Sequence, residues 1–211
     1  MNYENRKVNR MLSIDLNTKD GAIPSHADRV SRAVALMLLI GGWALMALKP
    51  AAAGEQGPPR LAEVVALDEC DPATFNAALG AGICLNVTPF GSAVTLSDLL
   101  ASIAAGTPNP NWDFEPDSLT IKSGTILEVV NQGGEPHTFT EVAQFGGGFV
   151  PPANPPGESV VPECAGGFSN VKVASTRILA GSHLNITGLS KGTHLFQCCI
   201  HPWMHFQVTV K

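Results

Sequence analysis

Three kinds of soft metal ligand stand close together near the C-terminus of this 211-residue chain. Cys198, His201 and Met204 offer a thiolate, an imidazole and a thioether within one short stretch. This combination of ligands favours copper. A second imidazole, that of His137, is a candidate for the remaining ligand from far upstream. The residue types therefore predict a copper site.

Two strands must hold the ligand-bearing loop, because the residues on each side of it alternate in character. Residues 192–198 place His194, Phe196 and Cys198 on one face, which is typical of a β-strand. Residues 206–211 alternate again and predict a closing strand. The three ligands of the C-terminal stretch are thus expected on one loop between two neighbouring strands.

Residues 198–204 resemble the copper loop of amicyanin-like and plastocyanin-like cupredoxins. The family pattern Cys-x-x-His-Pro-x-Met stands here as Cys-Cys-Ile-His-Pro-Trp-Met. Residues 131–139 are similar to the family's earlier strand, which follows an asparagine and carries the other histidine. The resemblance covers about residues 112–211. It implies a type 1 (blue) copper centre with a near-trigonal plane and a weak axial thioether, supplied by His137, Cys198, His201 and Met204.

The same resemblance implies a function. One copper ion, Cu(I) or Cu(II), would sit in a rigid sandwich, and the protein would act as a one-electron carrier rather than an enzyme. Its partner would be a redox protein, a cytochrome or an oxidoreductase. The alternative is a copper-binding, delivery or storage protein that uses Cys198 and Cys199 without redox turnover.

Three residues beside the motif leave alternatives open. His205 would replace the thioether of Met204 with an imidazole if the loop were shifted by one residue. Thr138 stands where many cupredoxins have an asparagine that hydrogen-bonds the opposite copper loop. Glu141 would share a face with His137 in a regular strand, either as an extra carboxylate near the site or as a solvated residue at the strand end.

The remaining cysteines predict disulfides. Successive strand residues face opposite sides, so Cys198 at the metal directs Cys199 away from it. Four cysteines then remain, and in an oxidising compartment they allow three pairings. We favour Cys70–Cys84, which would clip a helix to the segment after it. The other pair, Cys164–Cys199, would tether the Gly/Pro-rich loop 143–169 near the copper loop.

The N-terminus indicates the compartment. Residues 33–48 are an uninterrupted apolar run of 16 residues, preceded by two arginines and followed by small residues up to Ala53. This pattern is typical of a secretory signal peptide, residues 1–53, cleaved after Ala53. An uncleaved membrane anchor is the alternative, although the run is shorter than the roughly 20 residues of a spanning helix. We therefore expect a periplasmic or secreted protein, and a monomer.

Removal of residues 1–53 would leave an acidic protein. The chain has 13 Lys+Arg and 18 Asp+Glu; residues 1–53 hold 7 and 4 of these, which leaves 6 basic against 14 acidic residues, a net charge of −8. Such a charge argues against nucleic acid and anionic membrane surfaces as partners, so that only the signal peptide would meet a membrane. It favours a basic redox partner.

The rest of the chain divides near residue 110. Residues 54–110 read as a linker and a small helical extension, with helix starts at Asp71-Pro72 and at Thr95. This segment is too short to bury a core of its own, and no recognisable chemistry stands in it. Residues 111–211 contain short alternating runs separated by turn signals. They predict an all-β domain, a cupredoxin-like Greek-key β-sandwich that binds copper.

Overall fold

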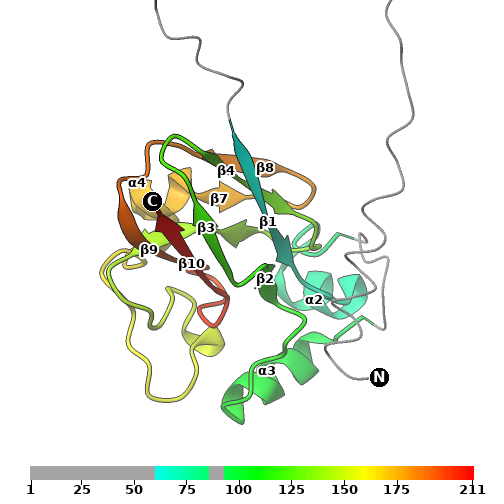
Figure 1. Ribbon diagram of the computed structural model, residues 1–211. Coiled ribbons are helices and arrows are strands. Elements are labelled where there is room, and N and C mark those ends of the chain that lie inside the picture. The colour runs from blue at the N-terminus through cyan, green and yellow to red at the C-terminus, as the bar shows by residue number, and fades with distance from the viewer. Residues whose placement is uncertain (1–59, 86–92) are drawn as a thin grey trace, which may run out of the picture. The chain divides into compact units, whose positions relative to one another are not determined.

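Two four-stranded sheets form the centre of the computed structural model, which describes residues 60–85 and 93–211 (Figure 1). The first sheet has the order β2 (Asp113–Glu115), β1 (Leu61–Leu67), β4 (Ile126–Asn131) and β8 (His183–Ile186). The second has the order β3 (Ser118–Ile121), β10 (His205–Val210), β9 (Gly192–Gln197) and β6 (Thr140–Val142). A short ribbon pairs β5 (His137–Thr138) with β7 (Arg177–Ile178).

The core lies between the two sheets, because residues of both point inward at every second position. In β10, Phe206, Val208 and Val210 are buried, and β4 buries Leu127 and Val129 in the same way. Apolar side chains that leave water along one face of each sheet drive the sheets together. The all-β sandwich that the sequence predicts is thereby confirmed.

An aromatic cluster fills the core next to the histidine-bearing strand β5. Phe139 stacks on Phe196 at a ring-centroid distance of 4.5 Å and meets Phe114 edge to face at 5.0 Å. Phe114 lies on β2 and Phe196 on β9, so Phe139 joins the two sheets through its ring. Such aromatic contacts add rigidity beneath the chain segment that carries His137.

The sequence analysis assigned residues 54–110 to a linker and a small helical extension, and the strand β1 within this segment corrects that assignment. The structure places Leu61–Leu67 inside the first sheet, parallel to β4 and antiparallel to β2. The second half of β1 is a continuous apolar run covered on both faces, and Val64, Val65 and Ala66 are all buried. The alternation that reveals a half-buried strand was therefore missing.

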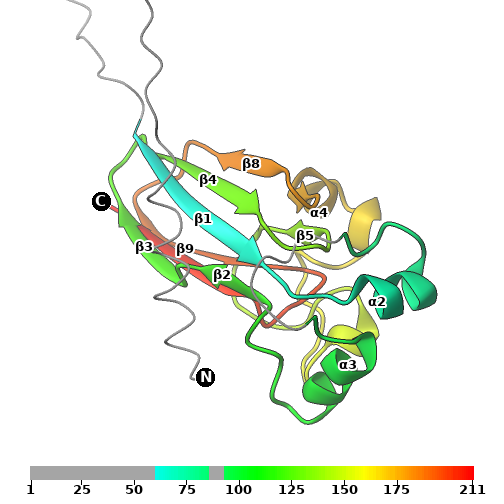
Figure 2. The same cartoon turned by 90° about the vertical axis from the view of Figure 1, so that its right-hand side faces the viewer.

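Two helices follow β1, near the positions that the sequence predicts. Helix α2 (Pro72–Leu79) begins after Asp71, whose carboxylate accepts the N–H groups of Ala73 and Thr74. Helix α3 (Leu96–Ala104) begins after Thr95, whose hydroxyl accepts the N–H of Asp98 at 3.2 Å. Figure 2 shows both helices at the end of the sandwich where the β9–β10 loop emerges.

Both predicted disulfides are present. Cys70–Cys84 joins the residues before and after α2, and Cys164–Cys199 joins the long loop to the ligand-bearing loop. That long loop, residues 143–169, contains the short turns η1 (Pro151–Ala153) and η2 (Gly167–Ser169) and leads to α4 (Val171–Ser175). The long loop passes close to the β9–β10 loop, where the N–H of Phe149 donates to the carbonyl of Cys199 at 2.9 Å.

The predicted signal peptide, its cleavage point and residues 54–59 of the linker lie outside the described residues. Within residues 60–85 and 93–211, no helix combines the length and the apolar character that crossing a bilayer requires.

Candidate metal centre

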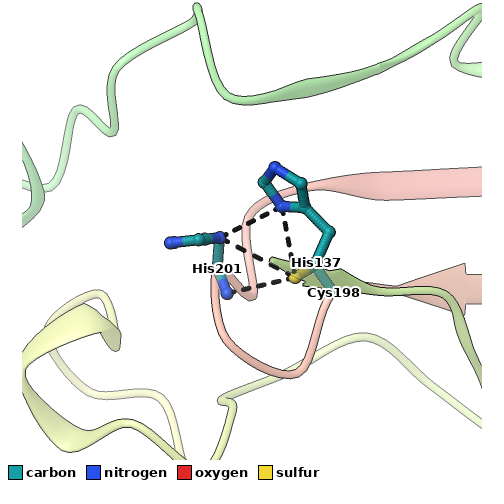
Figure 3. Close-up of side chains that lie close together, drawn as sticks. All are labelled: His137, Cys198 and His201. Atoms are coloured by element: carbon teal, nitrogen blue, oxygen red, sulfur yellow. Dashed lines mark hydrogen bonds between the residues drawn. The ribbon is translucent and has the colours of Figure 1, made fainter. Parts of the chain in front are cut away.

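Three of the four predicted ligands meet at one end of the sandwich (Figure 3). The Nδ1 atoms of His137 and His201 are each 3.8 Å from the sulfur of Cys198, and they are 3.3 Å from each other. Cys198 and His137 are fully buried, and His201 is 4% exposed. Two imidazole nitrogens and one cysteine sulfur thus form a closed triangle of potential ligand atoms.

The candidate ligands come from two places in the sheet structure, the strand β5 and the loop between β9 and β10. His137 opens the short strand β5, where it pairs with Ile178. Cys198 follows the last residue of β9, and its N–H donates to the carbonyl of Met204 at 3.1 Å. The N–H of Met204 in turn donates to the carbonyl of His201 at 2.9 Å. These backbone bonds close the loop into a tight turn and bring residues 198 and 201 to the same side.

The sulfur of Cys198 also receives backbone hydrogen bonds. The N–H groups of Thr138 and His201 both point at it, each at 3.4 Å. The hydroxyl of Thr138 accepts the N–H of Cys199 at 2.7 Å. Threonine therefore links the histidine strand to the ligand loop here, the role that the resemblance gives to asparagine.

Met204 and His205 lie in different surroundings. Met204 is fully buried within the main core. The ring of His205 stacks on Phe145 of the long loop at a ring-centroid distance of 3.9 Å. Among the described residues, the ligand atoms of His137, Cys198 and His201 lie within 4.8 Å of one another, and His205 is not part of this group. The assignment of Met204 as the axial ligand stays a prediction.

Cys199 is no second thiolate, because it forms a disulfide with Cys164. The sequence alternative of a copper site built from Cys198 and Cys199 is therefore wrong for this structure. Glu141, the other residue that could have approached the site, forms an ion pair with His194 at 2.6 Å and is 45% exposed. Of the two alternatives for Glu141, a carboxylate near the site or a solvated residue at the strand end, the structure therefore shows the second.

Two buried carboxylates lie behind the histidines, and the sequence analysis missed both. Oδ2 of Asp68 is 2.8 Å from Nε2 of His137, and Oε2 of Glu135 is 3.6 Å from Nε2 of His201. Asp68 follows the unexpected strand β1, and Glu135 stands two residues before His137. An acidic residue at the end of an apolar run was the signal that could have identified Asp68.

Cys198, His137 and Asp68 stabilise one another's ionised forms. Burial raises the pKa of the Cys198 thiol, but the two histidines outweigh it and hold that pKa well below its usual value. Burial lowers the pKa of His137, but hydrogen bonds to Asp68 and Cys198 raise it to about 10. Burial raises the pKa of Asp68, but the hydrogen bond and charge of His137, together with the N–H groups of Glu135 and Gly134, lower it by more. These surroundings favour the thiolate of Cys198, the form that binds metals.

The donor set fits copper. Because both Nε2 atoms face carboxylates, both Nδ1 atoms remain for a metal, and they face the thiolate. Two imidazoles and one thiolate in a triangle are the in-plane ligands of blue copper sites. His137, Cys198 and His201 would hold the ion, with Met204 as the candidate fourth ligand.

Comparison with solved structures finds copper proteins. A purple cupredoxin from Nitrosopumilus maritimus is 14% identical, with a TM-score of 0.33 over 71% of this chain and 99% of that one. A mutant plastocyanin of fern is 16% identical, with a TM-score of 0.34 over 71% and 100%. A mutant amicyanin, Cu(I), is 18% identical, with a TM-score of 0.30 over 47% and 73%.

Neither a scan against protein-family models nor a search of the curated proteins found a match. At these identities and TM-scores the likeness to the solved structures carries no argument about this chain. What the site can do therefore rests on its own geometry.

Proposed function

We propose that this protein is a type 1 (blue) copper protein of the cupredoxin family that carries one electron at a time. The observation that carries the proposal is the buried triangle of His137 Nδ1, Cys198 Sγ and His201 Nδ1. With Met204 as an axial ligand, the set is that of an electron-transfer site. A bound copper ion supplies a one-electron Cu(II)/Cu(I) couple.

The chain's own residues keep the ligand triangle from rearranging. The Thr138 hydroxyl and the Cys164–Cys199 disulfide hold the ligand loop against the sandwich. The N–H groups that point at the Cys198 sulfur stabilise its negative charge, which tunes the balance between the two copper states. A site that keeps one geometry in both states needs little reorganisation when an electron enters or leaves.

Partner and compartment belong to the same proposal. A net charge of −8 after residue 53 supports a basic redox protein, such as a cytochrome or an oxidoreductase, as partner. Two disulfides support an oxidising compartment, the periplasm or the outside of the cell, reached through a signal peptide. We propose a monomeric carrier rather than an enzyme, because four protein ligands leave no position for a substrate.

The deciding experiment is a visible absorption and EPR spectrum of the mature protein with one Cu(II) bound. We expect an intense thiolate-to-copper band and a narrow copper hyperfine splitting. Both should vanish in Cys198→Ala and persist in the control His183→Gln, which changes an exposed histidine of β8. A colourless or ordinary Cu(II) spectrum in the unaltered protein would overturn the proposal.

A further inference from the structure

The carboxylate of Asp68 is buried among hydrogen-bond donors next to the metal centre. Its Oδ1 accepts the N–H groups of Gly134 at 2.9 Å and Cys70 at 3.2 Å. Its Oδ2 accepts the N–H of Glu135 at 3.0 Å and lies 2.8 Å from Nε2 of His137. Asp68 is 3% exposed, and a buried carboxylate with this many donors is held in its ionised form.

An ionised carboxylate can only accept, so Nε2 of His137 must carry the proton and donate it to Asp68. The other ring nitrogen, Nδ1, is the atom that faces the Cys198 sulfur, so it is the one that would give up its proton and offer its lone pair to a metal. A carboxylate on the far nitrogen of a ligating imidazole fixes the ring's tautomer and orientation, and it makes the ring a stronger donor.

The loop before His137 is shaped to receive this carboxylate. A Cβ atom on Gly133 would overlap Oδ2 of Asp68, and one on Gly134 would overlap the sulfur of Cys70. The side chain of Asn131 holds the loop in place, since it accepts the N–H of Gly133 and donates to the carbonyl of Glu135. Glycine at both positions lets the backbone N–H groups close on Asp68.

The second carboxylate makes a weaker contact. Oε2 of Glu135 is 3.6 Å from Nε2 of His201, beyond hydrogen-bond distance, and it already accepts the indole N–H of Trp112 at 2.8 Å. Of the two candidate ligand histidines, His137 therefore makes the full hydrogen bond to a carboxylate, that of Asp68.

We propose that Asp68 is a positioning residue of the metal centre, which holds His137 with Nδ1 toward the metal and favours the more highly charged Cu(II) over Cu(I). The proposal rests on the proposed function. It extends the site to the segment around β1 and α2, outside the region that resembles a known family. Reduction adds one electron from the reduced redox partner, and Asp68 changes no bond in that step.

The test is Asp68→Asn, which keeps the size of the side chain and removes its negative charge. Loss of a carboxylate of this kind lowers metal affinity by about 10–100-fold. We expect a loss of that order for Cu(II) and a smaller one for Cu(I), both measured by competition with chelators. The reduction potential should rise by about 59 mV for each tenfold change in the ratio of the two affinities.

The matched control is Asp71→Asn, the same exchange in a half-buried helix cap of the same segment. It should leave the potential and both affinities unchanged. Asp68→Asn with an intact blue band and an unchanged potential would overturn the proposal. Absence of the band in the unaltered protein would instead count against the proposed function, so that the two failures are distinguishable.

A second measurement needs no variant. Nitrogen NMR of the unaltered protein in its Cu(I) form should show His137 with a proton on Nε2 that does not exchange readily, because Asp68 accepts it away from water. A His137 ring with a bare Nε2 would contradict the proposal even where Asp68→Asn fails to fold.

Discussion

The hydroxyl of Thr138 accepts the backbone N–H of Cys199 at 2.7 Å and so ties the histidine-bearing strand to the ligand loop. Thr138 is fully buried, and its own N–H points at the Cys198 sulfur. One residue therefore joins the two chain segments that supply the candidate metal ligands His137 and Cys198, which lie 61 positions apart in the sequence.

Thr138→Val keeps the shape of the side chain and leaves the N–H of Cys199 buried without its acceptor. An unsatisfied buried donor costs about 1–3 kcal/mol, so the free energy of unfolding should fall by that amount in a denaturant titration. The control Thr193→Val changes an exposed residue of β9 and should stay within about 0.5 kcal/mol. Equal denaturation midpoints for Thr138→Val and the unaltered protein would contradict the prediction.

Met204→Leu distinguishes the two candidate axial ligands. Exchange of methionine for leucine in a core usually costs less than about 1.5 kcal/mol, so the protein should fold. The blue band should remain, because the in-plane ligands are intact, while the reduction potential should rise because Cu(II) loses a donor. His205→Gln should leave the potential unchanged. If the potential responds to His205→Gln and not to Met204→Leu, the axial assignment is wrong.

The double variant Cys164→Ala/Cys199→Ala tests whether the disulfide is structural. Its removal should lower the free energy of unfolding by about 2–5 kcal/mol, as for other native disulfides. The thiolate-to-copper band should keep its position and intensity, because Cys199 faces Cys164 and not the metal. Loss of the band in a variant that is still folded would mean that Cys199 contributes to the site.

The ion pair of His194 and Glu141 predicts a pH-dependent contribution to stability. The bond to Glu141, and then that to the Ser190 carbonyl, raise the pKa of His194 above its usual value near 6.5. A raised pKa in the folded state stabilises the fold fully below the unfolded value and loses this effect as the pH rises through the folded value.

Unfolding titrations of the unaltered protein and of Glu141→Gln, made across this pH range, measure the effect directly. The difference in stability between the two proteins should be largest at pH values below about 6 and should shrink as the pH rises. An NMR titration of His194 should give a lower pKa in Glu141→Gln. A stability difference that does not depend on pH would contradict the assignment.

The sequence by itself predicted His137, Cys198 and His201 as candidate ligands and favoured the two disulfide pairs that the structure contains. The spacing of Cys198 and His201 places both ligands in one turn, which is local geometry, and strand alternation turns Cys199 away from the metal. The identity of these residues also limits the metal, because a thiolate with imidazoles favours copper. The spacing of Cys198 and His201 and the orientation of Cys199 depend on residues that are neighbours in the chain, whereas His137 and Cys164 come from distant segments.

Only the tertiary structure decided that Asp68 belongs to the site. Asp68 and His137 are 69 positions apart, and β1, which delivers Asp68, lacks the alternation that marks a half-buried strand. A carboxylate after an apolar run is ordinarily solvated at the surface. The carboxylate of Asp68 is stable in the interior here because the N–H groups of Gly134 and Glu135 and the ring of His137 surround it once β1 has paired with β4. These contacts join segments that are distant in the chain, so no local sequence pattern predicts them.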